Sequence, residues 1–367
     1  MPGVEAVGAV LRELGAPLVV ESIQLDEVTS HEVRVRVHAS GVCRSDLTVA
    51  HADHGFPLPL MLGHEIAGTV EAIGSAVRGI AVGDHVVACP VNHCGRCARC
   101  RNGQPFLCHD HHATARTSEQ ASRVSVAGES VTQFIGIGGF ADRVVLHENL
   151  VVPIPHEVPF DVACLLGCGV STGLGAVLNT AGVTHGDTVV VVGCGGVGLN
   201  AVQGARIAGA RRIIAIDLND EALRLATELG ATDVINSSYG DPVAEVKRVT
   251  NGLGVTHAFE IIGRPETLEI ALASLGKGGS AYLVGVQKPD AILGIPFRHF
   301  FDQKSVHGVA MGSTIPQIHI PEYAELYLQG RLRLDELVAN RITLAEVNEG
   351  LDRLRTGGVA RSVILFE

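Results

Sequence analysis

The sequence of 367 residues lacks several features, and most of these absences exclude a class of protein. No window has the uninterrupted apolar length that crosses a bilayer, so we expect no membrane partner. The N-terminus has no basic region before an apolar run, and Arg12 and Glu13 interrupt the first such run. We therefore expect no signal peptide and a cytoplasmic protein. Tryptophan is also absent, but this excludes nothing.

The sequence has fewer basic than acidic residues. Lys and Arg number 28 against 39 Asp and Glu, and the formal net charge of −11 argues against binding to nucleic acid. Internal repeats and low-complexity linkers are not visible in the sequence. Apolar residues make up 46%, which is ample for sizeable cores, and the length suggests two domains of roughly 100–200 residues each.

The nine cysteines favour metal ligands or buried thiols over a disulfide framework. Four of them follow the spacing CxxCxxCx7C, namely Cys94, Cys97, Cys100 and Cys108. A turn can bring thiolates at such gaps onto one ion, and four sulfurs close a tetrahedral shell without an open position. An iron–sulfur cluster or free thiols are the alternatives, but the run lacks the Cys-Pro ending of ferredoxins. We expect a structural zinc in a lobe at about 89–109.

A glycine-rich turn, Gly193–Cys–Gly–Gly–Val–Gly198, lies between two apolar runs, Thr188–Val192 and Arg212–Asp217. The segment after the turn has helical spacing, so the order is strand, turn, helix and strand. Strands and helices go on alternating after that, which predicts a parallel, doubly wound sheet. The further strands are expected at 233–235, 256–261 and 280–286, and helices at Asp220–Leu229 and Glu266–Leu275.

The positions of the glycines favour a dinucleotide site over an ordinary strand-to-helix turn. Gly193 permits the tight bend, Gly195 lets the backbone approach a pyrophosphate, and Gly198 allows close packing of helix on strand. The helix N-terminus offers N–H groups and a positive dipole end to the phosphates. Asp217, at the end of the second strand, can accept hydrogen bonds from a ribose diol and would repel a 2′-phosphate. We therefore expect NAD rather than NADP.

The N-terminal part of the chain contains many short segments with glycine turns. Val33, Val35 and Val37 alternate with polar residues, which is typical of a strand with one exposed face. Such segments favour an antiparallel, barrel-like module. Residues 110–138 are polar and irregular, an apolar helical stretch begins at Phe160 and runs to about Ala181, and the tail is expected to return to the first module.

A second set of metal-binding residues is spread along the chain: Cys43, His64 with Glu65 beside it, and Cys168. Taken singly, each has an ordinary explanation as a buried thiol or a turn histidine. Two thiolates and one imidazole would, however, form a three-ligand zinc site with an open fourth position, which is the catalytic arrangement. Asp46 is a candidate partner for the other ring nitrogen of His64.

Together these motifs resemble the zinc-dependent alcohol dehydrogenases of the medium-chain dehydrogenase/reductase superfamily, over essentially the whole chain. The long segment 109–139 resembles the liver-type and class III branches. The resemblance implies a GroES-like β-rich catalytic domain at 1–170 and 311–367 and an NAD-binding Rossmann domain at 171–310. The motifs that carry it are Gly41–Asp46, Gly63–Glu65, the four-cysteine run, Gly167–Gly173, Gly193–Gly198 and Ala360–Phe366.

The resemblance also implies roles for single residues. Cys43, His64 and Cys168 would hold a catalytic zinc, the second of two per subunit. Ser45 would take the alcohol proton, while Glu65 would approach the metal and Asp46 would support His64. The expected cofactor contacts are Arg44, Thr172, Gly193, Gly195, Gly196, Val197, Gly198, Asp217, Val284, Val286 and Arg361.

The sequence departs from the liver pattern at two places. Thr48 occupies the position of the histidine that ends the proton relay, and His51 and His54 are either substitutes or solvated loop residues. A basic residue that often follows the ribose-binding acid is also missing, because Asn219–Ala222 occupies that region. The second departure bears on how tightly NAD binds.

The substrate is the least determined feature. Leu47, Phe56, Pro90, Phe140 and Val286 are candidates for an apolar pocket wall, although isolated apolar residues commonly belong to the core. We expect an enzyme acting on primary, aromatic or medium-chain alcohols and aldehydes, as a homodimer or homotetramer. The alternative is a class III-like formaldehyde dehydrogenase acting on a thiol adduct, for which Arg116 or Arg123 could supply a cation. A non-catalytic NAD-binding protein is a third possibility, and retention of the ligand set argues against it.

Overall fold

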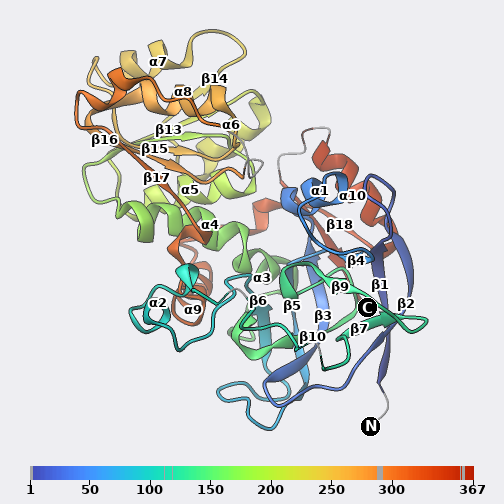
Figure 1. The fold of residues 1–367 in the computed structure, drawn as a ribbon. Coiled ribbons are helices and arrows are strands. Elements are labelled where there is room, and N and C mark those ends of the chain that lie inside the picture. The colour runs from blue at the N-terminus through green and yellow to red at the C-terminus, as the bar shows by residue number, and fades with distance from the viewer. Residues whose placement is uncertain (1–2, 111, 118, 287–291, 356, 358–359) are drawn as a thin grey trace. The chain divides into compact units, whose positions relative to one another are not determined.

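The computed structural model describes residues 3–110, 112–117, 119–286, 292–355, 357 and 360–367 (Figure 1). The chain folds into two compact units. Unit 1 comprises Met1–Cys168 and Ile315–Glu367, and unit 2 comprises Gly169–Thr314. The boundaries expected from the sequence, 170/171 and 310/311, lie a few residues from these.

Unit 1 is built on two β-sheets. Most neighbouring strands pair antiparallel, as expected, but β4 with β9 and β18 with β19 pair parallel. The first sheet has the strand order β8-β7-β2-β1-β4-β9, and the second has the order β11-β6-β5-β3-β19-β18 with β10 paired to β3. The strands of the first sheet are β1 (Val4–Leu11), β2 (Val19–Leu25), β4 (Leu60–Met61), β7 (Val124–Val126), β8 (Glu129–Ser130) and β9 (Thr132–Gln133). Those of the second are β3 (Glu32–Gly41), β5 (Glu65–Ile73), β6 (His85–Ala88), β10 (Arg143–His147), β11 (Val151–Pro153), β18 (Val338–Ile342) and β19 (Arg361–Leu365).

Side-chain alternation on β3 explains how these sheets enclose a core. Val33, Val35 and Val37 are buried in one apolar cluster with residues of both sheets. The C-terminal segment completes the second sheet, because β19 pairs antiparallel with the end of β3. The helices of unit 1 are α1 (Arg44–His51), α2 (Ala98–Arg101), α3 (Phe160–Ala163), α9 (Pro316–Leu328) and α10 (Val347–Arg355).

Unit 2 is a parallel sheet with the strand order β14-β13-β12-β15-β16-β17, as the alternation of strands and helices predicts. Helices α5 and α6 pack on each other, as do α7 and α8, and both pairs contact the sheet. The strands are β12 (Thr188–Val192), β13 (Arg212–Asp217), β14 (Asp233–Asn236), β15 (Val255–Glu260), β16 (Leu275–Leu283) and β17 (Ser305–Gly308). The helices are α4 (Gly169–Gly175), α5 (Gly196–Ile207), α6 (Asp220–Leu229), α7 (Pro242–Val249) and α8 (Pro265–Ser274).

Two sequence-based expectations need correction. The polar stretch 110–138 contains three short strands, β7 to β9, because it adds to the edges of the first sheet. The apolar stretch from Phe160 to Ala181 is not one helix, because Cys168 has non-helical dihedral angles (φ −133°, ψ −74°) that interrupt it. No single helix among the described residues is long and apolar enough to span a membrane. One bent pair of helical segments, Phe160–Gly167 with Gly169–Ala181, meets the length and composition requirement when its two parts are taken together.

Candidate functional site

The pairing of β3 with β5 brings the first candidate ligands together. Gly41, at the end of β3, lies opposite Glu65, at the start of β5. Cys43 follows β3 and precedes the first residue of α1, while His64 immediately precedes β5. Gly41 leaves room for the Glu65 side chain, because a Cβ at this position would lie 2.4 Å from Glu65 Oε2 and 3.1 Å from Glu65 Cβ. Residues distant in sequence thus become neighbours through one ladder of backbone hydrogen bonds.

Cys168 joins this cluster from the interrupted helical stretch. Gly167, just before it, packs directly on the Ala88 carbonyl of β6, where a Cβ would lie 1.9 Å from the oxygen. The ligand atoms of Cys43, His64, Glu65 and Cys168 all lie within 4.8 Å of one another. Two sulfurs and a ring nitrogen at this spacing fit a zinc ion with Zn–S bonds of about 2.3 Å and Zn–N bonds of about 2.0–2.1 Å, while the Glu65 carboxylate beside them is paired with Arg361 at 3.0 Å. We call these four residues the Cys–His cluster.

Asp46 fixes the geometry of the Cys–His cluster. Its side chain is fully buried, Oδ2 accepts a hydrogen bond from the Cys43 backbone N–H at 2.9 Å, and Oδ1 accepts one from the Gly63 N–H at 3.0 Å. Oδ1 also lies 3.1 Å from His64 Nδ1. With Nδ1 engaged, Nε2 is the ring nitrogen that can bind a metal. A carboxylate in this position orients the imidazole and strengthens it as a ligand.

The charges around the cluster shift the pKa values of its members. Burial opposes protonation of His64, but the Asp46 carboxylate outweighs it and raises the pKa of His64 well above its usual range. A hydrogen bond with Cys168 and the charge of Arg361 lower the pKa of Cys43. Burial raises the pKa of Glu65 to about 7, although Arg361 acts in the opposite direction. The hydrogen bond with Cys43 and burial raise the pKa of Cys168 instead. A metal needs deprotonated ligands, so a bound cation would displace protons from His64 and Cys168.

The remaining polar residues expected here lie close to the cluster. Ser45 Oγ is 3.3 Å from His64 Nε2. The Arg361 guanidinium, expected at a pyrophosphate, is buried and donates from Nη2 to Glu65 Oε1 at 3.0 Å and to Cys43 Sγ at 3.3 Å. Arg44, by contrast, is exposed at the first turn of α1. Arg361 thus acts on the cluster directly, a contact that sequence reasoning did not anticipate.

Helix α1 carries Thr48, at the position of the expected relay histidine, and His51, one of its two expected substitutes; the other, His54, is half-buried after the helix. Thr48 is exposed, and its Oγ1 donates to the Arg44 carbonyl at 3.0 Å, so its hydroxyl serves the helix backbone. His51 lies on the last turn of the same helix with Nδ1 3.0 Å from the Leu47 carbonyl oxygen. His51 is exposed, so its ring can reach solvent.

Aromatic residues line one side of His64. The ring of Phe134 stands edge-on to the His64 ring at 5.5 Å and edge-on to Phe56 at 5.1 Å between centroids. Leu47 belongs to the same apolar cluster. Phe140 has no exposed surface and packs against the Gly63 backbone, so it is a core residue rather than a pocket wall. Sequence reasoning missed Phe134, because a lone aromatic in a polar segment carries no periodic signal.

The other two pocket candidates are less informative. Pro90 is partly buried at the start of the cysteine lobe, and Val286 in unit 2 is 77% exposed. Within the described part of the chain, neither belongs to the apolar cluster that contains Leu47 and Phe134, and their part in a pocket stays a prediction.

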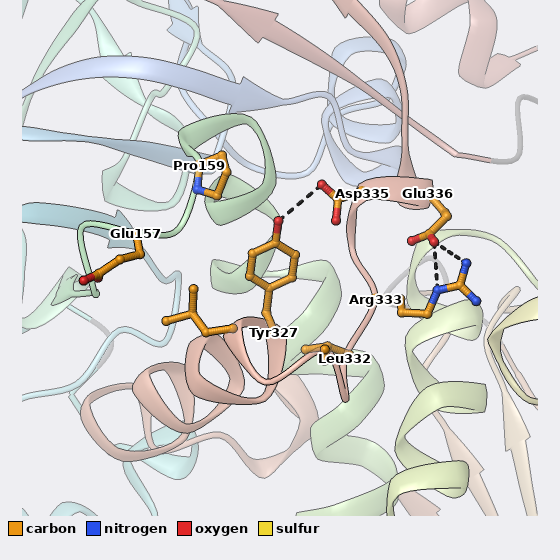
Figure 2. A pocket seen from close by; sticks show the side chains of 9 residues that line it. Glu157, Pro159, Tyr327, Leu332, Arg333, Asp335 and Glu336 are labelled. Carbon is orange, nitrogen blue, oxygen red and sulfur yellow. Dashed lines mark hydrogen bonds and ion pairs between the residues drawn. The ribbon is translucent and has the colours of Figure 1, made fainter.

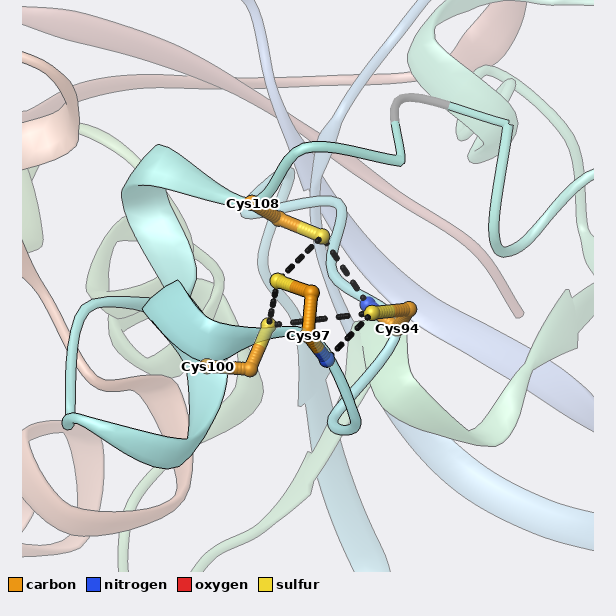
Figure 3. Close-up of side chains that lie close together, drawn as sticks. All are labelled: Cys94, Cys97, Cys100 and Cys108. Atoms are coloured by element: carbon orange, nitrogen blue, oxygen red, sulfur yellow. Dashed lines mark hydrogen bonds between the residues drawn. The ribbon is translucent and has the colours of Figure 1, made fainter.

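Four cysteines of the lobe form the second candidate metal site (Figure 3). The sulfur–sulfur distances are 3.5 Å for Cys97–Cys100, 3.9 Å for Cys97–Cys108 and 4.0 Å for Cys94–Cys100. Four sulfurs placed tetrahedrally at a Zn–S bond length of about 2.3 Å would be about 3.8 Å apart. A disulfide would need about 2.05 Å. Backbone N–H groups of Arg96 and Asp110 also point at these sulfurs, as suits thiolates.

The glycine turn of unit 2 has the space that a dinucleotide needs. Gly193 has φ +99°, and a Cβ would lie 2.6 Å from Ile262. A Cβ on Gly198 would lie 1.8 Å from the Gly193 carbonyl, so helix α5 packs directly on the turn. Gly195 faces open space, where a Cβ would meet nothing within 4 Å, and no side chain caps the N-terminus of α5. A phosphate could therefore approach the backbone at Gly195.

The acid expected at the ribose lies beside this turn. Asp217 Oδ2 accepts from the Cys194 N–H at 2.7 Å, and Oδ1 accepts from the Leu218 and Asn219 N–H groups at 2.7 and 3.0 Å. These bonds hold the carboxylate at the carboxyl end of β13, next to the turn. Gly196 and Val197, which begin α5, are half-buried.

The other expected cofactor contacts of unit 2 are spread over α4 and the end of β16. Thr172 is half-buried on α4, with Oγ1 3.8 Å from Met311 Sδ. The Val284 N–H donates to the Glu260 carbonyl at 2.9 Å, which anchors the segment after β16. Their contacts with a nicotinamide stay predictions.

Two further features of unit 1 concern a surface pocket and the two candidate arginines for a thiol-adduct substrate. A surface pocket of about 370 Å³ is lined in part by Glu157, Tyr327 and Asp335, and it shares no residue with the Cys–His cluster (Figure 2). Two polar pairs lie within it: the Tyr327 hydroxyl donates to Asp335 at 3.2 Å, and Arg333 pairs with Glu336. The side chains of Arg116 and Arg123 are both buried against Glu32.

Comparison with known proteins gives a consistent family. Residues 29–156 match the model of the alcohol dehydrogenase GroES-like domain, and residues 196–329 match that of the zinc-binding dehydrogenases. The expected fold class, a GroES-like domain with a Rossmann-like domain, is thereby confirmed.

Solved structures agree. An alcohol dehydrogenase zinc-binding domain protein from Burkholderia ambifaria is 35% identical over 100% of both chains, with a TM-score of 0.95. Benzyl alcohol dehydrogenase from Acinetobacter calcoaceticus is also 35% identical, over 99% of this chain and 100% of that one, with a TM-score of 0.93. A zinc-binding dehydrogenase from Sinorhizobium meliloti, bound to NADP, is 25% identical over 99% of this chain and 100% of that one, with a TM-score of 0.82.

Such dehydrogenases are oxidoreductases that act on small-molecule alcohols with zinc and a nicotinamide cofactor. On the strength of the two 35% identical relatives, the chain belongs to the zinc-dependent alcohol dehydrogenases of the medium-chain dehydrogenase/reductase superfamily.

Proposed function

We propose that this chain is an NAD-linked dehydrogenase with two zinc ions per subunit that interconverts primary alcohols, aromatic or of medium length, and their aldehydes. The observation that carries the proposal is the convergence of Cys43, His64, Glu65 and Cys168 within 4.8 Å. The four lobe cysteines would hold the second, structural zinc, because their sulfurs leave no ligand position for a substrate.

Each group of the Cys–His cluster has a distinct task in this proposal. When bound, zinc supplies a Lewis acid that lowers the pKa of a hydroxyl at its open position, and NAD supplies a hydride acceptor. Cys43, His64 and Cys168 would hold the metal, and Asp46 orients His64. The Ser45 hydroxyl, 3.3 Å from His64 Nε2, accepts the alcohol proton and passes it towards solvent. The alcohol loses one hydride and one proton, which leaves an aldehyde.

Selection of NAD over NADP would depend on Asp217. Its carboxylate is held by three backbone N–H groups beside the glycine turn, so it cannot easily swing away from a bound ribose. A 2′-phosphate would bring two further negative charges next to it, with no Lys or Arg in Asn219–Ala222 to offset them.

An aromatic alcohol suits the apolar wall beside the metal ligands. The Phe134 ring stands edge-to-face with His64, the Phe56 ring stands edge-to-face with Phe134, and aromatic rings favour such contacts. The 35% identity to benzyl alcohol dehydrogenase supports the same substrate class. The thiol-adduct alternative needs a cation for the carboxylate of the adduct, and Arg116 and Arg123 are both committed to Glu32.

We further propose a homodimer or homotetramer. Strand β17 lies at the edge of the unit 2 sheet, and Phe297 and Phe301, just before it in the chain, are 72% and 77% exposed. An open strand edge with exposed aromatics is typical of a surface that pairs with another copy.

The test is a comparison of kcat/KM values. The kcat/KM for benzyl alcohol should be higher with NAD than with NADP. It should also be higher than the kcat/KM for formaldehyde supplied with a low-molecular-weight thiol. A higher kcat/KM for the formaldehyde–thiol mixture would replace the proposal with its alternative.

A further inference from the structure

Glu260 is a buried acid at the carboxyl end of a central strand of the unit 2 sheet, where we propose that the cofactor binds. It is the last residue of β15, and only 2% of it is exposed. It pairs with Val192 at the end of β12 and with Leu283 at the end of β16. Glu260 therefore lies between the glycine turn, which follows β12, and the segment Val284–Val286, which follows β16.

The Glu260 side chain holds the turn that follows its own strand. Its Oε1 accepts hydrogen bonds from the Ile262 N–H at 2.9 Å, the Gly263 N–H at 2.8 Å and the Thr267 hydroxyl at 2.7 Å. Gly263 has φ +80°, a conformation that favours glycine. One carboxyl oxygen thus bends residues 261–263 back and ties them to helix α8.

This turn packs on the glycine turn. The Ile261 N–H donates to the Val192 carbonyl at 3.0 Å. A Cβ on Gly193 would lie 2.6 Å from Ile262 Cγ1, so the Ile262 side chain lies directly on Gly193. Ile262 is 43% exposed, which leaves part of it at the surface beside the glycine turn.

The same turn also packs on the segment after β16. The Glu260 carbonyl accepts from the Val284 and Gly285 N–H groups at 2.9 and 3.0 Å. A Cβ on Gly285 would lie 2.1 Å from the Gly263 nitrogen, so the two glycine backbones are in direct contact. Displacing residues 261–263 would therefore disturb both segments at once.

We infer that Glu260 is a positioning residue for the nicotinamide cofactor, acting through the 261–263 turn on Gly193 and on Val284–Val286. The inference rests on the proposed cofactor roles of those two segments. An acceptor oxygen is needed because three donors converge on one point, and a buried donor without an acceptor is costly. A side chain that keeps this oxygen should keep the cofactor site.

The experiment compares four variants of the full chain by NADH and NADPH affinity, followed through reduced-nicotinamide fluorescence, and by melting temperature. E260A removes the acceptor, and E260Q keeps one oxygen. T267V removes the Thr267 hydroxyl, which lies 2.7 Å from Glu260 Oε1 and 2.9 Å from the Arg264 carbonyl oxygen. T250V is the matched control: Thr250 Oγ1 accepts the Gly254 N–H at 2.9 Å and anchors the loop at the opposite end of β15.

We expect E260A to weaken NADH binding about tenfold, T267V by about two- to fivefold, and E260Q by less than about twofold. T250V should lower the melting temperature and leave the dissociation constant for NADH unchanged. Equal NADH affinity in wild type, E260A and T267V would overturn the inference, whatever the melting temperatures. If E260A does not fold, T267V decides alone. A wild-type protein that binds neither NADH nor NADPH would instead overturn the proposed cofactor, a separate and distinguishable failure.

Discussion

Replacing Asp46 by asparagine should weaken the Cys–His cluster in a way that can be worked out from its contacts. Oδ2 receives the Cys43 N–H, while Oδ1 receives the Gly63 N–H and faces His64 Nδ1. An amide has one acceptor oxygen, so in either orientation its NH2 group faces at least one buried N–H donor. An unpaired buried donor costs about 1–3 kcal/mol, and loss of the partner of a metal-binding histidine typically weakens metal affinity about 10–100-fold.

The assay is zinc release to a chromophoric chelator, with the melting temperature measured in parallel. We expect D46N to release one of two zinc ions at about 10–100-fold lower chelator concentration and to melt at a lower temperature. D241N is the matched control, because Asp241 caps helix α7 by accepting the Val243 and Ala244 N–H groups, and asparagine caps as well as aspartate. Wild-type zinc affinity and stability in D46N would refute the role given to Asp46.

Three other sites lead to further predictions. Burial alone would raise the pKa of Glu32, but Arg116 and Arg123 outweigh it and hold the pKa at about 2, below the usual value of about 4.3. This pair of values corresponds to about 3 kcal/mol of stability that is present above pH 4.3 and is lost as the pH falls towards 2. The difference in unfolding free energy between wild type and E32Q should therefore shrink between pH 5 and pH 3. A constant difference would count against the ion network. D217A should lower the ratio of kcat/KM with NAD to kcat/KM with NADP by about tenfold or more, and an unchanged ratio would remove Asp217 from the ribose site. C97S should cost one zinc and several degrees of melting temperature before it affects turnover, whereas loss of turnover at an unchanged melting temperature would argue against a structural role.

Much of unit 2 is predictable from local pattern. The all-valine core of β12, the glycine turn and the apolar β13 form one strand–turn–helix–strand unit whose period is visible in the sequence. The break in the helical stretch 160–181 is not predictable from local pattern. It lies at Cys168 and comes from packing of Gly167 on Ala88, a contact between segments far apart in the chain. Short strands in the polar stretch 110–138 escape prediction for a similar reason, since they depend on partners such as β2.

The site shows the same division. Spacing alone identifies the four-cysteine lobe, because all of its ligands lie within one turn-rich segment. The Cys–His cluster comes from three distant segments, so only resemblance to a family could join them before the β3–β5 pairing was known. Phe134 and Glu260 could not be singled out, because one aromatic or one acid has no periodicity. The directions of Arg116 and Arg123 likewise have no signal in the sequence, because both depend on Glu32, more than 80 residues earlier in the chain.

The most direct test of the central claim is the zinc content of purified, metal-replete protein and of its C43A variant, measured with benzyl alcohol turnover in the same samples. The account predicts two zinc ions per chain and NAD-linked turnover in the wild type, and one zinc, no turnover and unchanged NADH binding in C43A. One zinc in both proteins, or full turnover in C43A, would contradict it.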